Sequence, residues 1–219
     1  MNVRAREPFR FWGCTEIRES LGVRAESERQ LMERLESVPT ESVYYHTVRC
    51  LLRHQVVHGP YPDDFSMWVA TEVRDPMLAE KLALSSPFDF DSTEAFKDHL
   101  IGILDDHLAS LPFAPRIFVG SPFYFLKGHL AAVALDVEAA DLAGFRQRLA
   151  EADDSSVYYH AVEAIGRLDR PQNDFAAWLD GALRLPALAT RIGEIDPFVV
   201  SLSGLRKQIL LAVDEELRH

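Results

Sequence analysis

The sequence predicts a mostly helical α+β protein in which two similar lobes share a small sheet. Two observations carry this prediction. The chain repeats itself at a nearly constant offset, and each copy opens with alternating aromatic residues before continuing with helical periodicity. The pentapeptide Ser-Val-Tyr-Tyr-His at residues 42–46 returns unchanged at residues 156–160. We therefore expect one duplicated architecture, with its lobes related by a pseudo-twofold axis.

The repeat extends over most of the chain. At an offset of 114, residues 9–49 align without a gap to residues 123–163, and 13 of these 41 positions are identical. At an offset of 110, residues 64–88 match residues 174–198 at 9 of 25 positions. The predicted lobes are residues 1–112 and residues 113–219, either as separate bodies or as one merged core.

Each copy begins with a strand. Residues 9–18 and 123–135 open with aromatic residues at every second position, which is the pattern of a strand with one buried face. A lone strand would bury unpaired backbone amides at a cost in free energy. We therefore expect the two strands to pair with each other.

Interchangeable capping residues predict where the helices begin, because their side-chain oxygens accept hydrogen bonds from the free amides of a first turn. The aligned pairs are Ser27 and Asp141, Thr40 and Asp154, and Asp63 and Asn173. Two aligned prolines suit the first turn of a further helix. These are Pro76 and Pro186. About five helices per lobe follow.

The repeated pentapeptide is expected to lie on an amphipathic helix. Its apolar side chains fall on one helical face in the first copy. They are Val43, Tyr44, Val48, Leu51 and Leu52.

The composition and charge of the chain argue against several classes of partner and location. The 219 residues include 47% hydrophobic residues, enough for a sizeable core, and the formal charge of −11 is spread over both halves of the chain. This balance argues against nucleic acid or an anionic membrane as a partner. No apolar run is long enough to span a membrane, and no apolar signal segment opens the chain, so a cytoplasmic protein is expected. Cys14 and Cys50 have no paired spacing and are expected to be reduced.

The duplicated polar and aromatic residues are the candidate ligand-binding residues. The histidines have the chemistry for acid–base or hydrogen-bonding roles, the aspartates for orienting them, and the aromatic rings for stacking on a sugar or base. The set comprises Tyr45, His46, Asp64, Trp68, Tyr159, His160, Asp174 and Trp178. The alternative is structural: each histidine holds its fold together through the aspartate or a backbone group.

A metal site in the first lobe is a second hypothesis. His46, Cys50 and His54 are spaced i, i+4 and i+8. His58, Asp63 and Asp64 follow in the adjoining loop, and all these side chains are of metal-ligating type. The second copy has no counterpart of His54 or His58, and no recognised metal-binding spacing is present. The alternative places the histidines as polar residues near a helix end. No metal or other cofactor is favoured.

Several segments together resemble a bacterial and archaeal family catalogued only as a domain of unknown function. The segments are FRFWGCTEIRESLGV, SVYYHTVRCLLRH, YPDDFSMWV, SSVYYHAVEA, QNDFAAWL, IDPFVV and LSGLRKQIL. The resemblance covers nearly the whole chain from about Phe9 onward. It implies no activity, cofactor or catalytic residue, and it supports treating the duplication as the natural unit.

Three functions stay open at this point. The favoured one is an accessory or regulatory binding module for a small polar ligand or a protein partner, because junctions of similar lobes commonly hold ligands. The second is a metal-dependent enzyme with its site in the first lobe. The third is a self-associating scaffold that buries its strand edges in a homodimer. The sequence contains no Gly-rich phosphate loop and no nucleophile elbow to favour a particular reaction.

Overall fold

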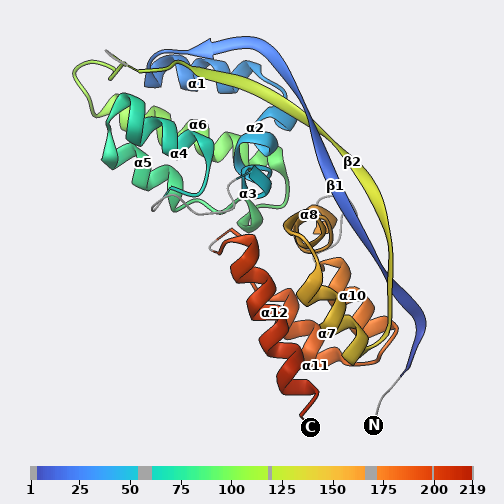
Figure 1. Cartoon of the computed structure of the whole chain (residues 1–219). Coiled ribbons are helices and arrows are strands. Elements are labelled where there is room, and N and C mark those ends of the chain that lie inside the picture. Colours follow the sequence, from blue (N-terminus) through green and yellow to red (C-terminus); the bar gives the residue numbers. More distant parts are fainter. Residues whose placement is uncertain (1–3, 54–60, 118–119, 166–171, 199, 219) are drawn as a thin grey trace. The chain divides into compact units, whose positions relative to one another are not determined.

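A computed structural model of the protein describes residues 4–53, 61–117, 120–165, 172–198 and 200–218 (Figure 1). Two long strands, β1 (Arg4–Ala25) and β2 (Phe123–Asp141), form a two-stranded sheet. They run antiparallel, since Arg10 pairs with Glu138 across the sheet while Glu19 pairs with Lys127. The predicted α+β class and the pairing of the two strands are confirmed.

The strands share a backbone feature at aligned positions. Gly22 in β1 has φ 68° and Asp136 in β2 has φ 52°, and these residues are 114 apart. Left-handed backbone is open to glycine and, at some cost, to aspartate. The two strands therefore take the same unusual conformation with different residues.

The chain packs into two compact units that divide both strands. The central unit comprises Glu16–His129, and the terminal unit comprises Met1–Thr15 together with Leu130–His219. The sequence repeat, in contrast, divides the chain at residues 112 and 113. Consequently the opening of each strand lies in the unit that holds the helices of the other repeat.

The central unit contains most of the helices between the two strands. They are α1 (Glu28–Ser37), α2 (Thr40–Thr47), α3 (Cys50–Arg53), α4 (Asp64–Trp68), the π-helix η1 (Val69–Val73), α5 (Pro76–Ala83), the short 3₁₀-helix η2 (Pro87–Asp89) and α6 (Thr93–Ala109). Phe123 and Phe125 from β2 join Phe65 and Phe96 in its core. Apolar burial of this kind is the main stabilising contribution to the unit.

The terminal unit repeats this scheme. Its helices are α7 (Leu142–Glu151), α8 (Asp154–Tyr158), the π-helix η3 (Tyr159–Glu163), α10 (Asp174–Gly181), α11 (Pro186–Gly193) and α12 (Leu202–Glu216). Phe9 and Phe11 of β1 pack against Phe145 and Phe175, with ring centroids 5.3–6.5 Å apart. The first strand therefore supplies aromatic core residues to the helices of the second repeat.

Most of the predicted helix starts are confirmed. Side chains of the predicted N-caps accept hydrogen bonds from backbone amides of the first turn at Ser27, Asp63, Asp141 and Asn173. The remaining predicted pair, Thr40 and Asp154, is wrong by one residue. Pro39 and Asp153 occupy the cap positions, and only Asp153 accepts a hydrogen bond there, from the amide of Ser156.

The apolar face of the pentapeptide helix also needs correction. Tyr45 is buried and Tyr44 is only half-buried, the reverse of the prediction. In addition, α2 ends at Thr47 and a turn precedes α3, so one uninterrupted helical face does not run from Val43 to Leu52. In the terminal unit the buried tyrosine is Tyr158.

Two further expectations concern thiols and membranes. Cys14 and Cys50 are both buried and free, as predicted. Among the described helices, none combines the length and apolarity that crossing a membrane requires.

Candidate functional site

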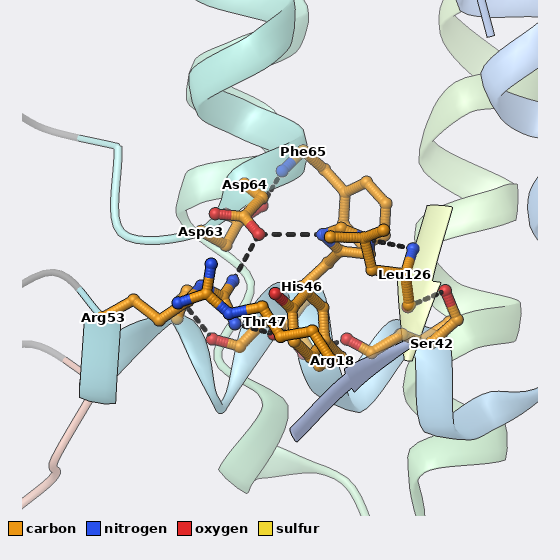
Figure 2. A network of polar contacts seen from close by, with 12 residues as sticks. Arg18, Ser42, His46, Thr47, Arg53, Asp63, Asp64, Phe65 and Leu126 are labelled. Carbon is orange, nitrogen blue, oxygen red and sulfur yellow. Dashed lines mark hydrogen bonds and ion pairs between the residues drawn. The ribbon is translucent and has the colours of Figure 1, made fainter. Parts of the chain in front are cut away.

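His46 sits at the centre of a polar network in the central unit (Figure 2). Its Nδ1 lies 2.8 Å from Oδ2 of Asp64, and its Nε2 accepts the backbone N–H of Leu126 at 2.9 Å. Because a backbone amide can only donate, Nε2 carries no proton, and Nδ1–H donates to Asp64. Burial lowers the pKa of His46, although the hydrogen bond from His46 to Asp64 acts in the opposite direction.

His160 makes the same contacts in the terminal unit. Its Nδ1 lies 2.8 Å from Oδ2 of Asp174, and its Nε2 accepts the backbone N–H of Trp12 at 2.8 Å. Trp12 and Leu126 are 114 residues apart, at aligned positions of β1 and β2. Each histidine therefore ties its helix both to an aspartate and to the strand that begins the other repeat.

The two tryptophans follow the same rule. The indole N–H of Trp68 donates to the carbonyl of Ser121, and that of Trp178 donates to the carbonyl of Glu7, both at 2.8 Å. Ser121 and Glu7 are again 114 residues apart. Trp68 is buried whereas Trp178 is half-buried. Trp178 therefore binds the first part of β1, and Trp68 binds the residues just before β2.

The structure divides the eight sequence-predicted site residues into two sets. Tyr45, His46, Asp64 and Trp68 lie in the central unit, and Tyr159, His160, Asp174 and Trp178 lie in the terminal unit. In each unit both ring nitrogens of the histidine are engaged by protein groups, and both histidines are buried. Their geometry is that of structural pins.

The central unit adds charged residues around its histidine pin. Arg53 donates to Oδ2 of Asp64 at 2.5 Å and lies 3.5 Å from Oε2 of Glu16. Its guanidinium stands over the ring of Tyr45, 4.0 Å from the centroid, in cation–π geometry. Asp64 thus receives both an imidazole N–H and a guanidinium N–H.

Glu16 and two further arginines complete this group, which we call the arginine cluster: Arg18, Arg49 and Arg53 with Glu16 and Asp64. Burial raises the pKa of Glu16, and the neighbouring arginines oppose this rise. Arg18 lies 3.7 Å from Glu16 and its side chain is 60% exposed. The cluster therefore reaches from a buried carboxylate to solvent.

Three of the five members of the arginine cluster have no equivalent at the aligned positions of the second repeat. The other two have one, since Asp64 aligns with Asp174 and Arg53 falls on Arg167 at the offset of 114. Glu16, Arg18 and Arg49 align at the offset of 114 with Leu130, Ala132 and Glu163. The close approach of β2 also requires a glycine. A Cβ on Gly128 would lie 2.8 Å from the Tyr45 ring and 3.0 Å from Glu16. Comparison of the repeats is the sequence signal that marks this cluster.

The predicted metal group of the first lobe is not assembled by the described residues. His54 and His58 lie outside them. Asp63 is a buried helix cap whose Oδ1 accepts from Phe65 and Ser66 amides while Oδ2 accepts from the Ser66 hydroxyl, and burial raises its pKa to about 6. The single S–H of Cys50 lies between two carbonyl acceptors, those of Thr47 and Pro62, and burial raises the pKa of this thiol.

A different group of ligand-type residues does converge in the central unit. Glu28 in the first turn of α1, Asp75 at the cap of α5 and His107 in the last turn of α6 place one donor atom each within 4.8 Å of one another. Oδ2 of Asp75 lies 3.0 Å from Nε2 of His107, and Oε2 of Glu28 lies 3.7 Å from the same nitrogen. Burial and the charge of Asp75 raise the pKa of Glu28 to about 8.

Sequence reasoning missed this triad because its members come from three distant helices with no shared spacing. A signal was nevertheless available in the repeat. Glu28 aligns with Leu142 and Asp75 aligns with Leu185, so at two positions the first repeat has an acidic residue where the second repeat has leucine.

Comparison with known proteins agrees with this fold. A family model described as a family of unknown function, DUF5752, matches residues 6–214. The solved structure of OrfY from Thermoproteus tenax is similar to this chain, with a TM-score of 0.79 and 25% sequence identity, covering 97% of this chain and 96% of that one. No curated protein matches. The chain belongs to the DUF5752 family of unknown function.

Proposed function

We propose that the protein is an accessory or regulatory binding module, and that it binds a small polar molecule carrying an anionic group at the arginine cluster of the central unit. The observation that carries this proposal is the asymmetry between the units. Both have the histidine pin, but the described part of the terminal unit has Leu130, Ala132 and Glu163 where the central unit has Glu16, Arg18 and Arg49. Residues that one repeat has and the other replaces are not needed for the shared fold, so they are the better candidates for function.

Both ring nitrogens of His46 and of His160 are already hydrogen-bonded within the protein, which argues against acid–base catalysis by these histidines. A general base needs a free nitrogen within reach of a substrate proton. The two nitrogens of His46 are bound by Asp64 and by the Leu126 amide, and its side chain is only 4% exposed. The same arrangement recurs at His160, which fits a shared structural role.

The charges of the arginine cluster favour an anionic ligand. Three guanidinium groups accompany two carboxylates, so the cluster carries a formal excess of one positive charge within a chain of formal charge −11. Arginine presents a planar set of donors that matches carboxylate and phosphate oxygens. Arg18 contacts Glu16 at 3.7 Å while its side chain is 60% exposed, so its guanidinium has further N–H donors to offer a ligand oxygen while the pair with Glu16 remains.

Calorimetric titration with inorganic phosphate and with succinate, at constant ionic strength, tests this proposal. We expect saturable binding of at least one probe to the wild type and at least about tenfold weaker binding to Arg18→Ala, a loss of about 1.4 kcal/mol. Arg10→Ala is the matched control, because Arg10 is an exposed arginine paired with one carboxylate outside the cluster. Absence of binding by both probes, or equal binding to Arg18→Ala, contradicts the proposal.

A homodimer is a second candidate, and one observation favours it. Within the described residues, β1 and β2 pair only with each other, so each strand has one edge without a strand partner. Such edges commonly pair with another chain or are protected from doing so. Sedimentation velocity over a wide concentration range tests this expectation, and a concentration-independent monomer contradicts it.

A further inference from the structure

We propose that Glu28, Asp75 and His107 form a binding site for one divalent transition-metal ion of the Zn²⁺ class, which joins α1, α5 and α6 of the central unit. This site is separate from the arginine cluster, shares no residue with it and does not depend on the function proposed above.

The donor spacings suit a single ion. Metal–nitrogen and metal–oxygen bonds of about 2.0–2.2 Å at tetrahedral angles place neighbouring donor atoms roughly 3–3.6 Å apart. Nε2 of His107 lies 3.0 Å from Oδ2 of Asp75 and 3.7 Å from Oε2 of Glu28. The donor atoms of Glu28 and Asp75 lie within 4.8 Å of each other, so the three donors converge on one region, and binding of a single ion draws them together.

The ionised form of Glu28 is stabilised by a cation at this buried position. Its side chain is 0% exposed, and neither of its carboxylate oxygens has a hydrogen-bond partner within the described part of the chain. A buried carboxylate without a partner is costly. A divalent cation bound to Glu28 and Asp75 neutralises both carboxylates and gives the Glu28 oxygens a ligand.

The second repeat provides an internal comparison. Leu142 and Leu185 stand at the positions aligned with Glu28 and Asp75. When α6 and α12 are aligned on their N-cap residues, Ser92 and Ser201, the residue aligned with His107 is Glu216, at the end of α12. The repeated frame therefore folds with apolar residues at two of these positions, and the buried polar triad is not a requirement of the architecture.

The donor set defines the class of ion. One imidazole nitrogen with two carboxylate oxygens suits Zn²⁺ and other divalent transition metals, whereas Ca²⁺ takes six to eight oxygens. Asp75 also keeps its helix-capping bond through Oδ1, which accepts the amide of Leu78 at 3.0 Å, so Oδ2 remains for the ion. Its side chain is 17% exposed, the most of the three, and marks the side from which an ion enters.

Calorimetric titration of untagged, chelator-treated protein with Zn²⁺ tests the site. We expect one ion per chain. Binding by Glu28→Gln should be at least about 100-fold weaker, because loss of an outer-shell partner alone costs about 10–100-fold and Glu28 is proposed as a direct ligand. Glu28→Leu should lose Zn²⁺ binding as Glu28→Gln does. It is expected to fold, because Leu142 occupies the aligned position of the second repeat. His129→Gln is the matched control, since His129 belongs to an exposed pair with Glu19. It should bind Zn²⁺ as the wild type does.

A second comparison separates this site from the histidines outside the described residues. The double variant His54→Ala, His58→Ala should keep wild-type Zn²⁺ affinity, and Co²⁺ should give ligand-field absorption bands in the wild type that Glu28→Gln lacks. Zn²⁺ should also raise the melting temperature of the wild type but not that of Glu28→Gln. The proposal is overturned if the wild type binds no Zn²⁺, or if the histidine double variant loses binding that Glu28→Gln retains.

Discussion

The surroundings of His46 and His160 differ far more than the two histidines themselves. Each ring links an aspartate at 2.8 Å to a backbone amide of the opposite repeat's strand at 2.8–2.9 Å. Around His46 stand Arg53 and Glu16, and elsewhere in the same unit lies the buried triad of Glu28, Asp75 and His107. On our proposals, the residues that the repeats share maintain the architecture, and the residues that they do not share form the binding sites.

The largest expected effect concerns the two tryptophans. Trp68→Ala should lower the free energy of unfolding by about 3–5 kcal/mol, because it removes a buried ring and its bond to Ser121. Trp178→Ala should cost less, about 1–3 kcal/mol, because its ring is half-buried. Denaturant unfolding of both variants measures the difference. Near-wild-type stability of Trp68→Ala would place that ring outside the core.

Replacing the histidines tests whether they are equivalent pins. His46→Ala and His160→Ala should each cost about 2–4 kcal/mol, since each removes two hydrogen bonds and leaves a backbone amide of the strand without its acceptor. The two losses should agree within about 1 kcal/mol, and the exposed His129→Ala should change stability by less than about 0.5 kcal/mol. A small loss at one of the two histidines would assign that residue to a site.

Glu28 gives the central unit a pH dependence that can be isolated. Its pKa is about 8 in the folded chain against 4.5 ordinarily, so the folded state binds the extra proton between these values. Its contribution to stability is therefore present below pH 4.5 and is lost as pH rises toward 8. In metal-free protein at pH 8, Glu28→Gln should be more stable than the wild type by on the order of 1–3 kcal/mol.

The measurement is urea unfolding of wild type and Glu28→Gln between pH 5 and pH 8.5. The stability difference should grow with pH and then level off. A difference that is constant with pH would show that the Glu28 carboxyl is not shifted, and saturating Zn²⁺ should reverse the order of stabilities if the metal site is occupied.

The smallest expected effect is at the exposed end of the arginine cluster. Arg18→Ala should change stability by no more than about 0.5 kcal/mol, because its ion pair with Glu16 is long and its side chain is 60% exposed. Thermal unfolding of Arg18→Ala, compared with that of the control variant Arg10→Ala, measures this effect. A loss well above 1 kcal/mol would make Arg18 part of the fold and weaken its role in ligand binding.

Much of the fold was predictable because its causes are local. Helix caps act within a single turn, as at Ser27 and Asn173, and so do the first-turn prolines Pro76 and Pro186. Alternating aromatic residues marked both strands. The exchange of strand openings between units was not predictable, since it depends on contacts such as Phe9 with Phe145 across more than a hundred residues.

The same distinction applies to the sites. His46 and Asp64 were found as a repeated pattern, and their mutual contact follows from it. The triad was not found, because nothing in the sequence around Glu28 indicates that α5 and α6 bring Asp75 and His107 to it. A residue-by-residue comparison of aligned positions, Glu28 with Leu142 among them, was the only local evidence.

The most direct test of the central claim is the protonation of the two histidine rings by ¹⁵N NMR at neutral pH. The structure predicts the Nδ1–H tautomer for both His46 and His160, with unprotonated Nε2 atoms accepting hydrogen bonds from the amides of Leu126 and Trp12. Equivalent spectra for the two rings, with both amides protected from exchange, are the predicted result. An Nε2–H tautomer in either ring, or rapid exchange of either amide, would contradict the claim that the repeated histidines are structural pins.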